Sequence, residues 1–138
     1  MPDGIELVLA DHRRVDALFA EFAETGDATV AGQIVDALTA HDQAEHAALY
    51  PLVGELLGDD AIVERAALAH SAVKQTIEQL VGLEGAALVV ALQVLQEVVD
   101  AHVQDEEEQI LPALRDAATP GQLDGLAARI EQAKQRVG

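Results

Sequence analysis

The chain contains no cysteine, and this absence narrows the chemistry that it can perform. Disulfide bonds, iron-sulfur clusters, thiolate zinc sites and cysteine nucleophiles are all excluded. Any metal ion bound by this protein must therefore be held by nitrogen and oxygen ligands.

Aromatic residues are scarce as well. The chain has one tyrosine, two phenylalanines and no tryptophan. No stretch alternates polar and apolar residues as a half-buried strand does, whereas apolar residues recur at helical spacing along almost the whole chain. The sequence therefore predicts an all-α protein.

Basic residues are few, because 8 lysines and arginines face 25 acidic residues and give a net charge of -17. Such a charge repels phosphate backbones and anionic membrane surfaces. We therefore expect neither a nucleic-acid partner nor a membrane partner.

Long uncharged runs are missing too. The N-terminal segment reaches Asp3 and Glu6 without the basic and apolar regions of a signal peptide, and no run of eighteen residues is free of charged residues and histidine. We expect a cytoplasmic protein. A length of 138 residues fits one domain, residues 1–138.

Turn residues divide the chain into four long helical segments and one short one. Gly26, Pro51, Gly58, the Gly82–Gly85 segment and the pair Thr119-Pro120 mark the divisions. The expected helices span about residues 3–24, 28–50, 60–81, 86–115 and 120–135. Short links between long helices predict an up-down-up-down antiparallel four-helix bundle with a short C-terminal fifth helix.

The short fifth helix has apolar positions of its own. These are Leu123, Leu126, Ile130 and Val137. They could pack across the end of the bundle or mediate self-association, and packing within a monomer is the favoured interpretation.

Each of the four long helices carries a histidine where its apolar stripe should continue, and in two of them a glutamate follows four residues later. The residues are His12, His41, Glu45, His70, His102 and Glu106. Burying four imidazoles and two carboxylates among aliphatic side chains is unfavourable by several kcal/mol for each group without a partner. A shared cation would remove that cost.

The spacing in the two histidine-glutamate pairs places an imidazole and a carboxylate on one helix face, one turn apart. This spacing is weak evidence alone, because 25 of the 138 residues are acidic and such pairs arise by chance. The set of one core-facing histidine per helix is more specific. It predicts two metal ions bridged by the two carboxylates and capped by two histidines each. Ligands of this kind suit iron or manganese and are compatible with zinc.

Four other polar residues have less specific roles. Asp16, one turn after the first histidine, is expected to hold that imidazole by a hydrogen bond. His46 is expected at the rim or surface, and Tyr50 is expected to pack, with a place at the end of the metal chamber as the alternative. Glu107 is the alternative ligand should the register be off by one, in an acidic run otherwise expected on a solvated face.

With these residues identified, the chain resembles the hemerythrin-like family of HHE cation-binding domains. The family pattern is a lone histidine, H-x-x-x-E, a second lone histidine and a second H-x-x-x-E, and the six residues meet it in order. The resemblance covers about residues 5–115 and includes Leu-Tyr-Pro at 49–51 and Ile-Leu-Pro at 110–112.

The resemblance implies a non-haem di-iron centre, with two Fe ions joined by an oxo or hydroxo bridge and by both glutamates. By the same analogy, His12 and His41 would cap one iron, and His70 and His102 the other. The oxygen-carrying hemerythrins also place a second histidine one turn from the third-helix histidine and an aspartate five residues after the fourth-helix histidine.

Here Ala66 and Lys74 flank His70, so six protein ligands replace seven. The open position is available to water or an exogenous ligand, unless Tyr50 or His46 fills it.

The expected function is that of a di-iron protein that binds or transforms dioxygen, nitric oxide or hydrogen peroxide in oxidative or nitrosative stress defence. A catalase-like or peroxidase-like activity, or consumption of nitric oxide, is left open. The alternative is an oxygen or iron sensor or storage module that acts through a partner without turnover. A ferritin-like oxidase fits less well, since that family uses Glu-x-x-His pairs. A purely structural bundle leaves four buried histidines unexplained.

Overall fold

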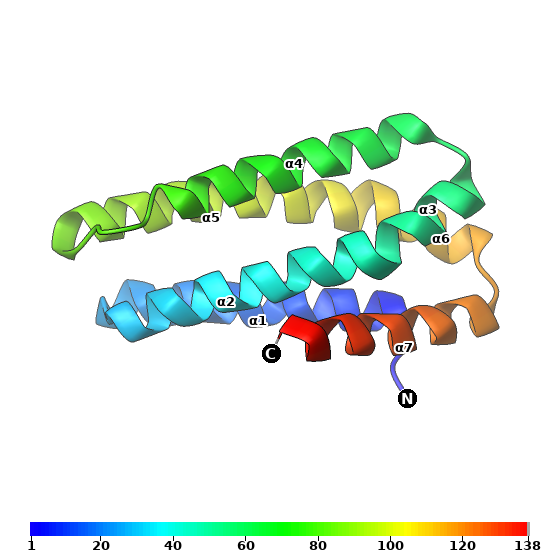
Figure 1. Cartoon of the computed structure of the whole chain (residues 1–138), viewed down its shortest axis with the longest axis horizontal. Coiled ribbons are helices and arrows are strands. Elements are labelled where there is room, and N and C mark those ends of the chain that lie inside the picture. Colours follow the sequence, from blue (N-terminus) through cyan, green and yellow to red (C-terminus); the bar gives the residue numbers. More distant parts are fainter. Residues whose placement is uncertain (138) are drawn as a thin grey trace.

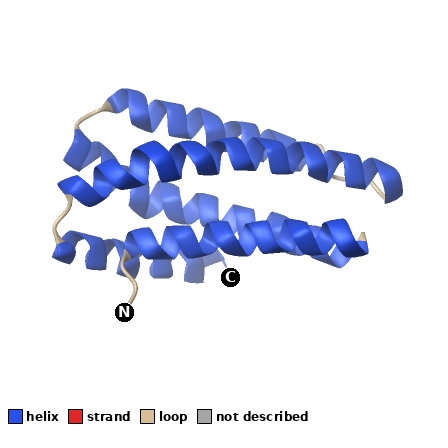
Figure 2. Ribbon diagram, turned by 180° about the vertical axis from the view of Figure 1, so that it is seen from behind, coloured by secondary structure: helices blue, strands red, loops and turns tan. Residues whose placement is uncertain are grey.

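The computed structural model describes residues 1–137, which form helices and no strands (Figure 2). The elements are α1 (Gly4–Thr25), α2 (Ala28–Ala44), the π-helical segment η1 (Glu45–Leu49), α3 (Tyr50–Leu57), α4 (Asp60–Glu78), α5 (Gly85–Asp105), the π-helical segment η2 (Glu106–Ile110), α6 (Leu111–Ala117) and α7 (Pro120–Val137). The predicted all-α class is confirmed.

The helices assemble into a bundle of long rods (Figure 1). One rod is α1, the second runs from α2 through η1 into α3, the third is α4, and the fourth runs from α5 through η2 into α6. Helices α1 and α2 pack together, as do α4 and α5, and α7 (red in Figure 1) lies along α1 and α2.

Local sequence explains where the first helix begins and ends. The Asp3 side chain accepts a hydrogen bond from the Glu6 backbone, and the Glu6 side chain accepts one from the Asp3 backbone, which forms a capping box. The helix ends at Thr25, and the next residue, Gly26, has a φ of 63°, in the left-handed region that glycine adopts without strain.

The two histidine-glutamate helices differ from the uninterrupted α-helices expected over 28–50 and 86–115. Each widens into a π turn that begins at its glutamate, and the second rod then continues beyond Tyr50 to Leu57. Pro51 and Pro112 each follow that glutamate by six residues. Proline cannot donate a backbone hydrogen bond, and its ring clashes with the carbonyl four residues earlier. A wider turn before the proline therefore lets the helix continue beyond it.

The core consists of two apolar clusters on either side of the polar residues. One cluster includes Val15 and Phe19, and the other includes Val8, Leu49 and Leu126. In each long rod the histidine separates a residue of one cluster from a residue of the other. The polar residues thus form a layer across the bundle.

The fifth helix packs within the monomer, as expected, but it lies along α1 and α2 and not across the end of the bundle. Leu123, Leu126 and Ile130 are all buried in the cluster near the α3 and α6 end. The side chain of Val137 lies outside the described residues.

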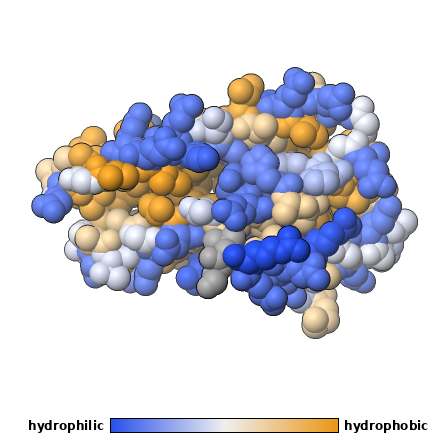
Figure 3. Space-filling model, viewed as in Figure 1, coloured by the Kyte–Doolittle hydropathy of each residue, from blue (hydrophilic) through white to orange (hydrophobic). Residues whose placement is uncertain are grey.

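One stretch, Gly85–Ala117, is long and apolar enough to cross a membrane by length and composition alone, which is weak evidence for a span. Only 22% of its most apolar window is buried, and Val89, Val90 and Val94 are exposed. Apolar residues gather on the surface towards the end where α4 connects to α5 (Figure 3). The same stretch nevertheless carries His102 and Glu106 into the interior.

A pair of glycine substitutions tests the close contact between α1 and α7. A Cβ at Gly4 would lie 2.3 to 2.7 Å from side-chain atoms of Leu126, whereas a Cβ at Gly32 would meet nothing within 4 Å. We expect Gly4→Ala to lower the free energy of unfolding by about 1–3 kcal/mol through overpacking. Gly32→Ala should raise it by roughly 0.5–1 kcal/mol, because alanine favours the helix.

Urea unfolding of both variants checks this pair. Equal effects of the two substitutions would contradict the packing of α7 against the start of α1.

Candidate metal centre

The six polar residues predicted from the sequence meet inside the bundle. Their exposed fractions are 6% for His12, 8% for His41, 1% for Glu45, 6% for His70, 8% for His102 and 0% for Glu106. The histidines come from α1, α2, α4 and α5, and each glutamate is the first residue of a π segment. The layer between the two apolar clusters is therefore a buried cluster of histidines and glutamates.

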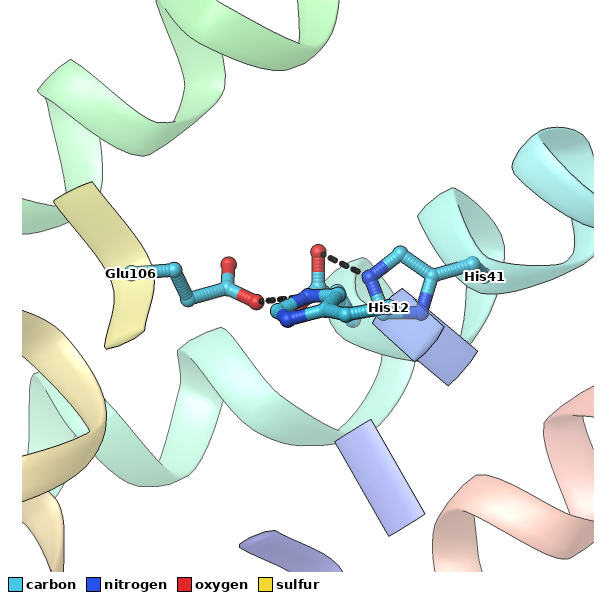
Figure 4. Close-up of side chains that lie close together, drawn as sticks. His12, His41 and Glu106 are labelled. Carbon is cyan, nitrogen blue, oxygen red and sulfur yellow. Dashed lines mark ion pairs between the residues drawn. The ribbon is translucent and has the colours of Figure 1, made fainter. Parts of the chain in front are cut away.

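Four of these residues, His12, His41, Glu45 and Glu106, form a first group. One nitrogen or oxygen atom from each lies within 4.8 Å of the others. His12 Nε2 is 3.0 Å from Glu106 Oε1, and His41 Nε2 is 3.1 Å from Glu45 Oε1. Figure 4 shows the side chains of His12, His41 and Glu106 converging on one space.

A second group shares both glutamates and adds His70 and His102, again within 4.8 Å. His70 Nε2 is 2.9 Å from Glu45 Oε1, and His102 Nε2 is 3.1 Å from Glu106 Oε2. Ligand atoms bonded to one ion at about 2.1 Å lie up to about 4.2 Å apart. Each group is therefore close to the size of the ligand shell of one metal ion.

Unpaired polar atoms show that the first group fits a cation. His12 Nε2, His41 Nε2, Glu45 Oε2 and Glu106 Oε1 are buried, and the close contacts between the histidines and the glutamates do not have the geometry of hydrogen bonds, so these atoms have no hydrogen-bond partner among the described residues. A buried polar atom without a partner typically destabilises a fold by about 1–3 kcal/mol. All four belong to residues of the first group, so one bound ion would provide a partner for these four atoms, while a fifth unpaired atom, His102 Nδ1, belongs to the second group.

Tyr50 occupies the second group instead of simply packing, which corrects the favoured expectation for this residue. Its hydroxyl donates to Glu106 Oε2 at 2.6 Å and lies 2.9 Å from His70 Nε2. The hydroxyl oxygen of Tyr50 is also 3.3 Å from Glu45 Oε1 and 3.4 Å from His102 Nε2. The tyrosine thus contacts every member of the second group.

The π turn explains why Tyr50 points inward. In a regular α-helix, five residues advance the chain by about 500°, so Tyr50 would face about 140° away from Glu45. The wider turn, closed by a hydrogen bond from the Tyr50 backbone to the Glu45 carbonyl, brings both side chains onto one face. The Leu-Tyr-Pro string, whose proline lies six residues after the glutamate, is the sequence feature that could have indicated this.

Three of the four histidines are held from behind by a carboxylate of another helix. The pairs are His12 with Glu107 at 2.6 Å, His41 with Asp11 at 2.9 Å, and His70 with Asp42. In each pair the imidazole contributes Nδ1, so its Nε2 faces the cluster. This is the arrangement that orients metal-binding histidines.

The expected role of Asp16 is therefore wrong. Asp16 is exposed, and Glu107 from η2 holds His12 instead. Glu107 lies behind His12, whereas Glu106 lies in the cluster. The cluster therefore contains the glutamate four residues after His102 and not the one five residues after it. Asp11 and Asp42 were not singled out from the sequence, although each is adjacent to a histidine of the set.

His46 lies at the rim, where the sequence placed it. Its side chain is 47% exposed, and its Nε2 is 3.4 Å from Asp42 Oδ1. It belongs to neither of the two groups that share the glutamates.

The carboxylates control the charge of the buried imidazoles. Burial lowers the pKa of His41, but Glu45, Asp11 and Glu106 outweigh this effect and raise that pKa to about 10. His102 is similar: burial lowers its pKa, and Glu106 and Glu45 raise it to about 9. A metal ion needs neutral imidazole, so it must displace protons from these histidines at neutral pH.

Tyr50 responds to the same carboxylates in the opposite sense. Burial, followed by the negative charges of Glu45 and Glu106, raises the pKa of the Tyr50 hydroxyl far above its usual value. Without a metal ion the hydroxyl therefore keeps its proton and donates a hydrogen bond to Glu106.

A small cavity lies beside the cluster. Its volume is about 30 Å³, and all four histidines contribute to its wall. The remaining wall is mainly aliphatic, from Val15, Leu38, Val73, Val99 and Val103. A cavity needs roughly 10–15 Å³ to hold one water molecule, so this one accommodates only a very small molecule.

Comparison with known proteins gives one family match. A family model described as the hemerythrin HHE cation-binding domain matches residues 3–114. The crystal structure of a hemerythrin HHE cation-binding domain-containing protein from Mycobacterium kansasii has a TM-score of 0.84 and 20% identity. The similarity covers 99% of this chain and 90% of that one, and it shows the shared fold.

A curated protein that is similar to this chain has a name that does not mention hemerythrin. A protein of Nostoc sp. (strain PCC 7120) called DNA nickase is 29% identical over 138 residues, with 96% of this chain covered. The chain spans only 39% of the length of that relative.

The raised histidine pKa values predict how the stability of the metal-free protein depends on pH. The pKa values of His41 and His102 rise from 6.5 to about 10 and about 9. The stability that comes from their ion pairs is complete below about pH 6.5 and is lost as the pH rises through the folded-state values. The melting temperature of the metal-free protein should therefore fall between about pH 7 and pH 10.

Thermal unfolding across this range, after metal removal with a chelator, checks the prediction. His41→Gln should flatten the decline, while His46→Gln at the rim serves as the matched control and should keep it. A melting temperature that rises over the same interval would be inconsistent with imidazolium in the cluster.

Proposed function

The chain belongs to the hemerythrin HHE cation-binding domain family, and we propose that it is a non-haem di-iron protein that binds or transforms a small molecule. The proposed small molecules are dioxygen, nitric oxide and hydrogen peroxide. The observation that carries this proposal is the aliphatic cavity of about 30 Å³ beside the histidines, which leaves no room for a larger substrate.

The proposed ligands are the six buried residues, with His12 and His41 on one ion, His70 and His102 on the other, and Glu45 and Glu106 shared. The unpaired atoms of the first group support a cation there. The nitrogen and oxygen donors, with no sulfur, support iron over metals that prefer thiolates. In this proposal the four rods form an up-down-up-down bundle that directs one histidine per rod inward.

Tyr50 is the proposed further ligand of the second ion. Its oxygen already lies 2.6 to 3.4 Å from ligand atoms of all four members of the second group. A metal ion at that position would have to share the space with the phenol oxygen, and a nearby cation favours the phenolate. His46 lies near Asp42 and His70 in a third group of possible ligands, but we leave it outside the ligand set because its side chain is 47% exposed and that group contains neither shared glutamate.

The protein residues supply orientation and exclusion of water. Carboxylates behind His12, His41 and His70 fix the direction of each Nε2. The valine and leucine side chains around the cavity keep bulk water from the place where the proposed small molecule would bind. Iron bound at this position would supply Lewis acidity and a change of redox state.

Stress defence is the proposed role, by consumption of peroxide or nitric oxide in the cytoplasm. The alternative is a sensor or storage module that binds oxygen or iron reversibly and acts through a partner. Turnover of added peroxide supports the first role. A reversible spectral change on exposure to oxygen or nitric oxide, without turnover, supports the second.

Nicking of DNA is not part of this proposal. That activity is named for a protein of which this chain spans 39%. The net charge of -17 opposes approach to a phosphate backbone, and we propose that nucleic acid is no partner of this chain.

Metal content tests the cofactor. Protein purified after growth with iron should contain about two irons per chain, with near-ultraviolet and visible absorption from a ferric pair. Glu106→Gln should abolish these bands, because the fully buried carboxylate is shared by both groups. Glu108→Gln, an exposed neighbour in the same acidic run, is the matched control and should keep them.

Elemental analysis and absorption spectra give the result directly. A protein with zinc alone, or with no metal, would exclude redox chemistry at this site.

The place of Tyr50 has its own spectroscopic test. The chain has one tyrosine, so any tyrosinate-to-iron charge-transfer band must come from it. Tyr50→Phe should remove that band while two irons remain bound. An unchanged visible spectrum in Tyr50→Phe would mean that the hydroxyl moves aside when the metal enters.

A further inference from the structure

Lys134 on α7 is connected to the histidine and glutamate cluster by a chain of polar contacts. Its Nζ donates to Asp11 Oδ1 at 2.5 Å, and Asp11 Oδ2 accepts from His41 Nδ1 at 2.9 Å. On the other side of the imidazole, His41 Nε2 is 3.1 Å from Glu45 Oε1. The contacts therefore lead from a half-exposed lysine to a proposed metal ligand.

Asp11 differs from the other carboxylates that hold histidines. Its side chain is 19% exposed, compared with 40% for Glu107 and 36% for Asp42. Among the described residues it is also the one of the three that pairs with a lysine. A carboxylate so enclosed needs a cation to compensate for lost hydration, and Lys134 supplies it.

Helix α7 is held firmly enough to keep the lysine in place. Ile130 and Ala133, the residues that precede Lys134 on the buried side of the helix, lie in the apolar cluster with Leu126. This helix lies outside residues 3–114, the part matched by the family model. The contact to Asp11 is therefore a feature of this chain that the six-residue ligand pattern does not contain.

We propose that Lys134 is a positioning residue that sets the electron donation of His41 to its metal ion through Asp11, an inference that rests on the proposed function. A carboxylate that accepts the Nδ1 hydrogen bond makes the imidazole a stronger electron donor. An ammonium group on the same carboxylate weakens that effect. Lys134 thereby makes the environment of His41 different from that of His12 and His70.

The direction of the effect follows from charge. Loss of the ammonium group leaves Asp11 more strongly basic and removes one positive charge near the site. Both changes favour the oxidised, more positive metal ion. Removal of Lys134 should therefore lower the reduction potential of the iron bound by His41.

The experiment compares iron-loaded wild-type protein with Lys134→Met, Lys134→Arg and Arg129→Met. Arg129 is exposed on the same helix and donates to the backbone carbonyl of Gly125 in its own helix, so its loss matches the change in net charge. The measurements are a redox titration followed by visible absorption and competition for iron with a chelator.

Lys134→Met should change the equilibrium constant of one reduction step at least tenfold in favour of the oxidised ion. This lowers the reduction potential by about 59 mV for one electron. It should also strengthen binding of the ferric ion at His41 by roughly tenfold, because the imidazole becomes the stronger electron donor. Lys134→Arg should restore both properties, and Arg129→Met should resemble the wild type.

Should Lys134→Met fail to fold, Asp11→Asn provides a second variant, for which the expected change in reduction potential is in the opposite direction. It removes the negative charge behind His41 and should raise the same potential. Equal potentials in Lys134→Met and Arg129→Met would overturn the proposal, even if Lys134→Met lowers the melting temperature of the metal-free protein. Wild-type protein that takes up no iron would overturn the proposed function as well, so the two failures are distinguishable.

Discussion

Two carboxylates, Glu45 and Glu106, are buried in the middle of the bundle, and their negative charge must be compensated there. Each carboxylate is almost fully excluded from water and contacts histidines from two pairs. Buried negative charge is tolerated only where positive charge or a metal ion compensates for it. The four rods must therefore converge so that each brings a histidine to the same layer, and the apolar clusters on either side hold them there.

Much of this cluster could be predicted from the sequence, because a polar residue that interrupts an apolar helical stripe is a local feature. The six central residues follow from that feature alone. Tyr50 and the π turns could not be derived in this way, since a regular helix directs Tyr50 away from Glu45. Only the widened backbone after each glutamate brings the tyrosine inward.

The carboxylates behind the histidines come from other helices, so helical spacing does not identify them. Asp16 has the expected helical spacing from His12, yet the histidine is held by Glu107, which is 95 residues away in sequence. Contacts between helices depend on how the rods are rotated against each other, which helical periodicity does not specify. Lys134 and Asp11 meet for the same reason, through the docking of α7 on α1 and α2.

We propose that this layer holds two metal ions that share the two glutamates. A crystal of the iron-loaded protein, measured at the iron absorption edge, would locate both ions. We predict two anomalous peaks, one between His12 and His41 and one between His70 and His102. An absence of peaks in the layer, or a single peak at the rim beside His46, would contradict this account.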